Sequence, residues 1–446
     1  MSPGQRDRSN VEACTTAPAR GHPPLRATYR LQLGPDLDFD GARELIPYLR
    51  DLGVSHLYVS PSMQARPGSA HGYDVIDPTS ISSELGGEPA FRELAGAAHA
   101  AGLGLVLDIV PNHMAADDAN PFWADPELRA RFFDIDPATG RHRRFFDIDD
   151  LVGVRQEDPE VFARTHALVL SLVREGVVDA LRIDHPDGLA DPASYLARLR
   201  EEGAATVWVE KILEGSERLR DWPVAGTVGY DFLNEACGLF VDPAAEATFS
   251  AVWEDLSGDS RSFEEVALEA KLEQATTTFA PELGRLAAMQ DVPGGLDALA
   301  RAVASFPVYR SYVREGERAG ADPDRPAVAD ADRAAVAAAA VAPELADMLL
   351  LRRPAAPGFV TRFQQTTPPV VAKGVEDTAF YRYARLLALC DVGGDPGRFG
   401  IDTERFHRAC RERANRFPHA LLATTTHDTK RSADTRARIA ALTWMP

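Results

Sequence analysis

A repeated unit, a short apolar run followed by a segment with apolar residues at helical spacing, constrains the fold of this chain most strongly. Runs typical of buried strands stand at 27–33, 56–63, 102–113, 177–185 and 206–213. Strands that are apolar on both faces and alternate with helices form parallel sheets covered on both sides. The closed form of such a sheet is the (β/α)₈ barrel, in which functional residues lie at the carboxyl ends of the strands. We therefore predict an α/β chain of the TIM-barrel type.

Ionisable residues gather where these predicted strands end. They are, in chain order, Asp108 and His113, then Arg182 to Asp187, then Glu210 and Lys211, and, in the run ALLATTTHDTKR at 420–431, His427 and Asp428. One acidic residue at the start of a loop is most often part of a surface ion pair. Four strand ends with the same pattern favour an active site instead.

The strongest candidate set is Asp184, Glu210 and Asp428. Two carboxylates that flank a sugar can serve as nucleophile and general acid/base, as retaining glycosidases require. Arg182 precedes Asp184 by two residues, so both side chains share one face of the strand. We expect Arg182 to keep Asp184 ionised, because an adjacent opposite charge favours the charged form.

The weaker candidates keep a structural alternative. In HGYD, Tyr73 offers a flat face for a sugar ring and Asp74 a hydrogen-bonding partner, although the motif taken alone favours a β-turn with a packed tyrosine. Asp108 and His113 suit a substrate hydroxyl or the positioning of the other carboxylates. A structural histidine is the alternative at His113.

The composition of the chain limits the classes of molecule that it is expected to bind. The chain has 446 residues and a formal charge of −19, which repels phosphate backbones and anionic lipid. We therefore expect no nucleic-acid and no membrane partner. The four cysteines form no CxxC pair, and no stretch is apolar enough to span a bilayer. The prediction is a cytoplasmic protein with neither cofactor nor metal.

The pattern divides the chain into four parts. β signals fade after residue 240 and return after 357, and the sixth strand, near 224–232, is weakly marked. The predicted parts are a flexible tail at 1–24, barrel strands one to six at 25–240 with a short excursion at 114–158, a helical insertion at 241–357 that contains the alanine run 334–340, and a return to the barrel at 358–446 with the strand that carries His427 and Asp428.

Four segments resemble the signatures of the α-amylase superfamily of glycoside hydrolases and transglycosylases. They are DIVPNH, LRIDHPDGL, WVEKIL and TTTHD, in the superfamily's order. Further segments, among them SPSMQARPGSAHGYDVIDPTSISSELGG and QQTTPPVVAKGVEDTAFYRY, resemble the maltooligosyltrehalose synthase family in particular. The resemblance covers most of residues 25–443 and is weakest in the helical insertion.

The resemblance implies roles for the candidate residues. Asp184 would be the nucleophile, Glu210 the general acid/base and Asp428 the residue that stabilises the oxocarbenium-like transition state. The implied substrate-binding residues are Tyr73, Asp74, Asp108, His113, Arg182, His185, Lys211 and His427. The implied reaction is an isomerisation by intramolecular transglycosylation. The α-1,4 bond at the reducing end of a maltooligosaccharide becomes an α,α-1,1 bond, with the carboxylates about 5–5.5 Å apart.

The sequence departs from that family in two places. The excursion after DIVPNH is shorter than the family's, and the chain stops at ALTWMP, soon after the fourth signature. We therefore expect an incomplete barrel without its eighth strand, which another chain would complete if one binds. Two alternatives stay open, a hydrolase of α-1,4-glucans or of maltooligosyltrehalose, and an inactive glucan-binding remnant. Residues 364–383 are predicted to help form the pocket for the released glucose.

Overall fold

A sheet of six parallel strands lies at the centre of the structure, a computed structural model that describes residues 24–315 and 328–445. The strands follow one another in chain order: β1 (Thr28–Leu31), β2 (His56–Val59), β5 (Gly104–Ile109), β9 (Ala180–Ile183), β10 (Val207–Val209) and β11 (Gly226–Thr227). Each lies within one of the six predicted strand segments. The predicted tail 1–24 falls outside the described residues except for its last residue.

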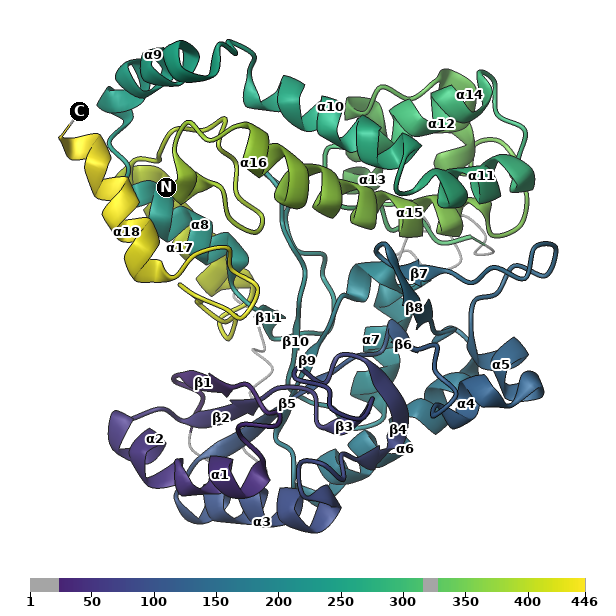
Figure 1. Ribbon diagram of the computed structural model, residues 1–446, viewed down its shortest axis with the longest axis vertical. Helices are drawn as coiled ribbons and strands as arrows, with labels where there is room; N and C mark the ends of the chain where they lie inside the picture. Colours follow the sequence, from purple (N-terminus) through teal and green to yellow (C-terminus); the bar gives the residue numbers. More distant parts are fainter. Residues whose placement is uncertain (1–23, 316–327, 446) are drawn as a thin grey trace, which may run out of the picture.

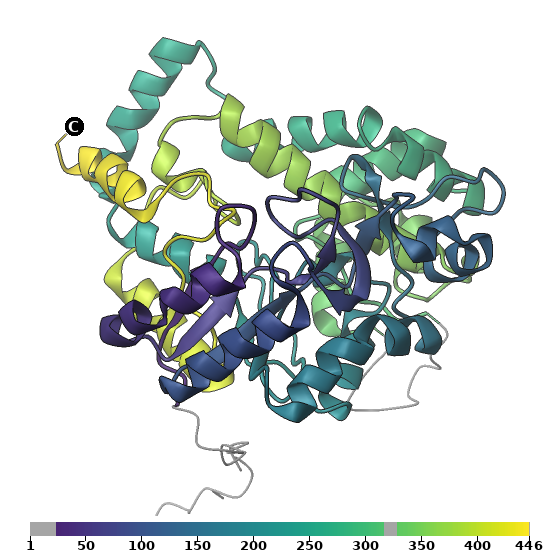
Figure 2. The same cartoon turned by 60° about the horizontal axis from the view of Figure 1, so that its bottom comes forward.

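Alternate residues of each strand face two different layers. Leu105 and Leu107 of β5 belong to the core between the sheet and its outer helices, whereas Val106 packs with Trp208 of β10 on the inner side. The outer helices are α1 (Phe39–Glu44), α2 (Ile46–Leu52), α3 (Gly87–Ala100), α6 (Pro159–Glu175) and α7 (Pro192–Glu201). Figure 2 shows α1, α2 and α3 along the side of the sheet that faces away from the later helices.

Two antiparallel sheets interrupt the β/α rhythm. β3 (Met63–Ala65) pairs with β4 (Val75–Ile81) directly after β2. The excursion forms a sheet in the order β6 (His113–Ala115), β8 (Ile148–Gly153), β7 (Arg144–Phe145), with α4 (Pro121–Ala124) and α5 (Pro126–Phe132) beside it. The last strands of the excursion thus return the chain to the start of α6.

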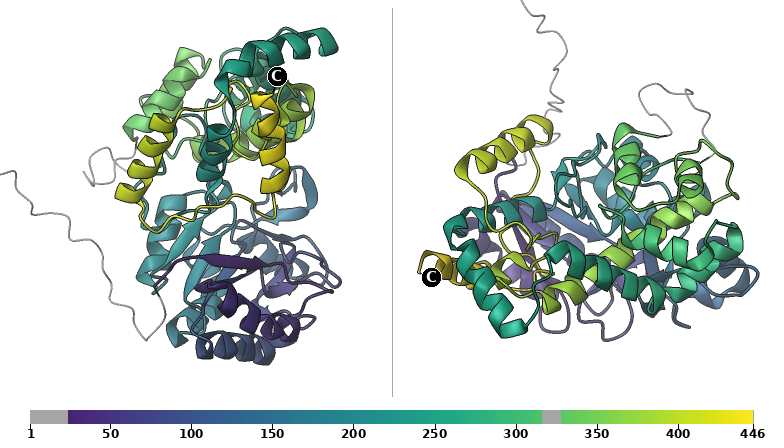
Figure 3. Two further views of the ribbon diagram at one scale, coloured as in Figure 1. Left: turned by 90° about the vertical axis from the view of Figure 1, so that its left-hand side faces the viewer. Right: turned by 90° about the horizontal axis from the view of Figure 1, so that it is seen from above.

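A separate helical layer lies over the inner side of the sheet (Figures 1 and 3). Its helices are α9 (Glu246–Ser257), α10 (Phe263–Thr276), α11 (Ala280–Met289), α12 (Gly295–Ala304), α13 (Asp330–Ala338), α14 (Pro343–Leu349) and α15 (Phe359–Gly374). The region predicted as a helical insertion is therefore helical. The layer continues past the predicted boundary at 357, because α15 packs against α10, α11 and α12.

The structure has further helices and turns outside these layers. They are α8 (Tyr230–Leu239), a π-helical turn (Val375–Ala379), α16 (Phe380–Arg382), α17 (Thr403–Arg416), α18 (Ala433–Ala441) and 3₁₀ turns at Pro186–Gly188, Pro243–Ala245, Leu387–Leu389 and Leu442–Trp444. Trp444 Nε1 donates to Phe240 O at 2.9 Å, which ties the last turn to the end of α8.

The segment 420–428, predicted as a barrel strand, is irregular. Leu421 N donates to Thr227 O at 3.1 Å, so the segment runs beside β11. Side chains donate hydrogen bonds to nearby backbone carbonyls that would otherwise accept from a neighbouring strand. Trp208 Nε1 donates to His419 O at 2.7 Å, and Arg436 Nη2 donates to Thr424 O. The parallel sheet therefore stops at six strands in the described residues, and the barrel is incomplete.

Candidate active site

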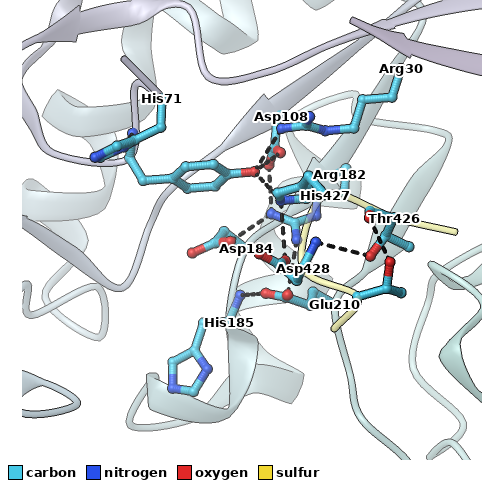
Figure 4. A network of polar contacts seen from close by, with 12 residues as sticks. Arg30, His71, Asp108, Arg182, Asp184, His185, Glu210, Thr426, His427 and Asp428 are labelled. Carbon is cyan, nitrogen blue, oxygen red and sulfur yellow. Dashed lines mark hydrogen bonds and ion pairs between the residues drawn. The ribbon is translucent and has the colours of Figure 1, made fainter. Parts of the chain in front are cut away.

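One buried guanidinium organises the carboxyl ends of three neighbouring strands. Arg182 of β9 is 1% exposed, and its Nη1 donates to Asp108 Oδ1 at 2.8 Å and to Asp184 Oδ1 at 2.6 Å. Its Nη2 lies 3.1 Å from Glu210 Oε1 (Figure 4). Asp108 pairs with Arg182 in the register of β5 and β9 and shares its inward face. The strand ends that carry charge in the sequence therefore meet around a single cation.

The turn after β9 supplies a second contact to Glu210. His185 has φ 40° and ψ 58°, a left-handed conformation that is uncommon for residues other than glycine. Its backbone N–H donates to Glu210 Oε2 at 3.0 Å. The two oxygens of Glu210 thus have different partners, Arg182 and the main chain of His185, and the side chain is held in one orientation.

Burial separates the protonation states of the two acids. Burial and the charge of Asp184 raise the pKa of Glu210 well above its ordinary value, against the opposing effect of Arg182. Burial also raises the pKa of Asp184, to about 6, although Arg182 opposes it. The expected contact between Arg182 and Asp184 is present, but desolvation outweighs its effect on the pKa. Burial therefore favours the protonated form of Glu210, whereas Asp184 is ionised above a pH of about 6.

Tyr73 connects this cluster to the irregular segment 420–428. Its hydroxyl donates to Asp108 Oδ2 at 2.7 Å, and the same oxygen lies 2.8 Å from His427 Nε2. Burial and the charges of Arg30 and Arg182 lower the pKa of His427 to about 3, so its ring is neutral. Since Tyr73 gives its proton to Asp108, we assign the proton of His427 to Nε2.

Asp428 is the most open of the three candidate carboxylates. Its side chain is 46% exposed, and its Oδ2 lies 3.1 Å from His427 Nε2. Tyr230, the first residue of α8, donates its hydroxyl to the same oxygen at 3.3 Å and lies 3.0 Å from Thr426 Oγ1. Side chains from outside the parallel sheet therefore position Asp428.

Asp184, Glu210 and Asp428 line one cavity of about 340 Å³. Phe145 and Phe146 of the excursion line it too, as do Tyr73, His113, His185 and His427. Ala372 and Glu376 come from the 364–383 segment, so this segment does contribute to the wall. Aromatic faces beside carboxylates suit an uncharged polyhydroxylated ligand such as a sugar.

Some of the predicted substrate-binding residues lie outside the cavity wall or are held in it by other side chains. His113 lies in the wall, but its ring stacks on Phe145 at 4.0 Å, and burial lowers its pKa to about 3. Asp108 lies behind the wall, where it holds Tyr73 and Arg182. The structure does not bring Lys211 and Asp74 to the lining.

Lys211 and Asp74 pair with other side chains instead of lining the cavity. Lys211 Nζ is 3.3 Å from Asp187 Oδ2 and 3.1 Å from Glu217 Oε1, and its side chain is only 1% exposed. Asp74 accepts from Ser69 Oγ at 2.5 Å within the loop before β4. Because strand side chains alternate, Lys211, one residue after Glu210, points to the opposite side.

Sequence reasoning missed several contributors to the cluster and the cavity, among them Tyr58, Arg30, Tyr230 and Tyr309. Tyr58 donates its hydroxyl to Asp108 Oδ2 at 3.2 Å, and Arg30 Nη2 donates to the Tyr73 hydroxyl oxygen at 3.2 Å. Tyr230 and Tyr309 also line the cavity. The inward alternation of β1 and β2 was a usable signal for Arg30 and Tyr58. Nothing local in the sequence places Tyr309 of the helical region here.

Among the described residues, no group of three or more histidine, cysteine, aspartate or glutamate side chains is arranged to hold a metal ion. No helix in the same part of the chain is long and apolar enough to cross a membrane. The prediction that the protein needs no cofactor stays a prediction.

Comparison with known proteins agrees with the geometry. Residues 26–129 match the family described as alpha amylase, catalytic domain. A putative maltooligosyl trehalose synthase of Mycobacterium tuberculosis is 37% identical over 95% of this chain and 65% of its own length. The chain thus spans about 65% of the length of these curated relatives.

Solved structures give the same result. The maltooligosyltrehalose synthase of Arthrobacter ramosus matches with a TM-score of 0.83 and 36% identity over 94% of this chain and 64% of that one. A hypothetical maltooligosyl trehalose synthase of Sulfolobus tokodaii matches with a TM-score of 0.81 and 30% identity over 94% of this chain and 65% of that one. The incomplete parallel barrel and the strand-end cluster around Arg182 agree with these likenesses: over residues 26–129 the chain is similar to an alpha-amylase catalytic domain, and over most of its length it is a shorter homologue of the maltooligosyltrehalose synthases.

Proposed function

We propose that the protein is an isomerase that converts the reducing-end α-1,4 bond of a maltooligosaccharide into an α,α-1,1 bond. The observation that carries this proposal is the sharing of one buried guanidinium by Asp184 and Glu210 at the wall of a single cavity. A protonated acid beside an ionised nucleophile is the arrangement that a retaining double displacement needs. The proposed substrate class, a maltooligosaccharide, is taken from the names of the relatives.

In the first displacement Glu210 donates its proton to the glycosidic oxygen while Asp184 attacks the anomeric carbon. The C–O bond breaks, the reducing-end glucose leaves as a free hydroxyl compound, and a glycosyl ester forms on Asp184. The raised pKa of Glu210 supports its role as the acid, since burial favours the form that carries the proton. Asp428, beside the neutral His427, provides negative charge for the oxocarbenium-like transition state.

In the second displacement the released glucose turns within the cavity and presents its own anomeric hydroxyl. Glu210, now ionised, accepts that proton, the oxygen attacks the sugar on Asp184, and the ester bond breaks. Two inversions return the original configuration at the transferred carbon. An oriented neighbour reaches an effective molarity of about 10⁵–10⁸ M, so a retained glucose outcompetes water. The expected carboxylate separation of about 5–5.5 Å stays a prediction.

Hydrolysis by the same carboxylates is the second candidate, and one observation favours it. A groove of about 790 Å³ lies between the β1 segment and residues 418–427, and Arg182, Tyr58 and Tyr230 line it. The groove shares Tyr230 and His427 with the cavity and reaches Arg182, so it gives water a second route toward the cluster. The glucan-binding remnant is the remaining alternative. The cytoplasmic location stays a prediction.

A proton NMR time course with maltohexaose tests the proposal. Loss of reducing-end signals with growth of an α,α-1,1 anomeric signal, and little free glucose, is the expected result. Growth of the reducing-end signals would instead identify the protein as a hydrolase. An unchanged spectrum from folded protein that still binds maltohexaose would identify a binding remnant.

A further inference from the structure

A second polar cavity lies away from the carboxylate cluster, where the excursion meets the helical layer. Its volume is about 470 Å³, and its wall includes Phe133 and Asp134 of the excursion and Thr361 and Arg362 of α15. In Figure 1 the β7–β8 hairpin lies directly below α15 and α11, so the cavity sits at the junction of these two regions. None of the three candidate catalytic carboxylates lines it.

Three arginines from three different elements converge on one carboxylate at this junction. Asp134 accepts from Arg362 Nη2 at 2.6 Å, from Arg143 Nε at 3.1 Å and from Arg285 Nη2 at 3.0 Å. Three guanidinium groups therefore share one negative charge, which leaves an excess of two positive charges at this point. The exposed fractions of the three arginine side chains are only 13%, 9% and 21%, so solvent screens this excess poorly.

Arg362 also carries unused hydrogen-bond donors. Its Nε and Nη1 are buried and have no hydrogen-bond partner in the described part of the chain. A buried donor without a partner is costly, and native structures usually satisfy such groups. Burial, together with the positive charges of Arg285 and Arg143, lowers the pKa of Arg362, as expected for a guanidinium that lacks compensating charge.

The other acidic residues of the wall already have partners. Glu157 Oε1 is 3.5 Å from Arg155 Nε. Asp191 caps α7 by accepting from Ser194 N at 3.0 Å and from Ser194 Oγ at 2.6 Å. Glu315 Oε2 accepts from Thr361 N at 2.9 Å and from Thr361 Oγ1 at 2.7 Å. Glu157 is thus paired with an arginine, whereas Asp191 and Glu315 accept from neutral donors and keep their negative charge at the wall. None of these contacts supplies the acceptors that Arg362 lacks.

We propose that this cavity is an oxyanion site, in which Arg362 and Arg143 bind a phosphate group. A phosphate carries about −1.5 to −2 charges at neutral pH, and arginine forks bind its oxygens through paired N–H groups such as the two that Arg362 leaves unused. The volume leaves room for a free phosphate ion or for the phosphate of a small sugar phosphate. The proposal is independent of the proposed isomerase activity.

The position of the site links it to the catalytic turn. Gln365, which lines the cavity one turn after Arg362, donates its Nε2 to Gly188 O at 2.9 Å. Ala190 and Asp191 of the wall follow that turn directly. An anion held here contacts the excursion, α15 and the loop after β9 at once.

Thermal unfolding with inorganic phosphate, glucose 6-phosphate and glucose as probes tests the site. Sodium chloride at matched ionic strength is the reference. We expect a saturable rise in the unfolding temperature with phosphate or glucose 6-phosphate and none with glucose. Equal affinity for the two phosphates assigns the site to the free ion, and tighter binding of glucose 6-phosphate assigns it to a sugar phosphate.

Arg362→Gln should weaken phosphate binding at least tenfold in isothermal titration calorimetry. The matched control is Arg174→Gln on α6, an exposed arginine 3.5 Å from Glu202, and it should bind as the original chain does. If Arg362→Gln fails to fold, Arg362→Lys keeps one charge beside Asp134, loses the planar fork, and should also bind more weakly. No saturable shift beyond the chloride reference, or an Arg362 variant that folds and binds as tightly as the original chain, would overturn the proposal.

Discussion

The two halves of the candidate active site are built in different ways. Asp184 and Glu210 directly follow β9 and β10, and their side chains are 8% and 17% exposed around Arg182. Asp428 comes from an irregular segment and is 46% exposed. The first half is fixed by a parallel hydrogen-bond ladder. The second is held by side chains such as Tyr230 and Arg436.

The difference teaches which half depends on the rest of the barrel. Neighbouring strands on both sides set the positions of β9 and β10, so their carboxylates need nothing beyond the described sheet. The 420–428 segment has β11 on one side and a groove of about 790 Å³ on the other. Contacts that fill this groove should therefore act on Asp428 far more than on Asp184.

The largest expected effect is on the strand-borne half. Glu210→Gln keeps the volume and the acceptor for His185 N but cannot exchange a proton, so turnover should fall by about 10²–10⁴-fold. The measurement is the NMR time course with maltohexaose. Glu202→Gln, an exposed site at the end of α7, is the matched control and should leave turnover unchanged.

The same variant has a signature in stability. Because the pKa of Glu210 is raised in the folded state, its contribution to stability is fully present at low pH and is lost as the pH rises through that pKa. The unfolding temperature of Glu210→Gln relative to the original chain should therefore increase from pH 5 to pH 8. A difference that stays constant over this range would mean that the carboxyl group is not strained by burial.

Arg182→Met tests the cation that unites the first half. It leaves Asp108, Asp184 and Glu210 buried without their common partner, and the free energy of unfolding at pH 7.5 should drop by about 3–5 kcal/mol. The loss should be smaller at pH 5, where protonation of Asp184 removes part of the uncompensated negative charge. Denaturant unfolding at the two pH values measures both effects. A loss independent of pH would point to packing rather than charge.

A matched pair of tyrosine substitutions compares the halves directly. Tyr58→Phe removes a buried hydroxyl from Asp108 and should cost about 0.5–1.5 kcal/mol of stability with little change in turnover. Tyr230→Phe removes the hydroxyl between Asp428 and Thr426 and should lower kcat several-fold with a smaller change in stability. Equal effects of the two variants on kcat would mean that the halves do not differ in this way.

The smallest expected effect is the pH dependence of kcat/KM, which comes from Asp184 and Glu210 in the strand-borne half of the site. Asp184 must be ionised to attack, so kcat/KM should fall as the pH decreases through about 6. Glu210 must be protonated, so kcat/KM should also fall at higher pH as its raised pKa is passed. Initial rates from pH 4 to 9 give the two limbs. An acid limb near pH 4, where an unperturbed carboxyl titrates, would contradict the burial of Asp184.

Local patterns predicted the part of the fold that rests on regular strands. Five apolar runs predicted β1, β2, β5, β9 and β10, because burial on both faces leaves a continuous signal in the sequence, whereas the short β11 was only weakly marked. The period of two predicted that Arg182 and Asp184 share one face of their strand, and the two side chains are in contact. The same rule accounts for the place of Lys211 outside the cavity lining, since it directly follows Glu210 and faces the other way, and its role in substrate binding stays a prediction.

Long-range contacts could not be predicted in this manner. The run 420–428 has β-type composition, yet Trp208 and Arg436, which bind carbonyls beside and within it, come from distant positions. The pairing of Asp134 with Arg285 and Arg362 spans the excursion and two helices. Such contacts depend on tertiary packing, which no local period encodes. The division of the chain at 240 and 357 stays a prediction.

The measurement that tests the central claim most directly is covalent trapping of Asp184. A fluorinated α-glucosyl fluoride, which slows release of a glycosyl-enzyme, is incubated with the protein, and the digest is examined by mass spectrometry. The account predicts a glycosyl ester on Asp184, lost in Asp184→Asn and retained, though formed more slowly, in Asp428→Asn. A label on another carboxylate, or no label on folded protein that binds the reagent, would contradict it.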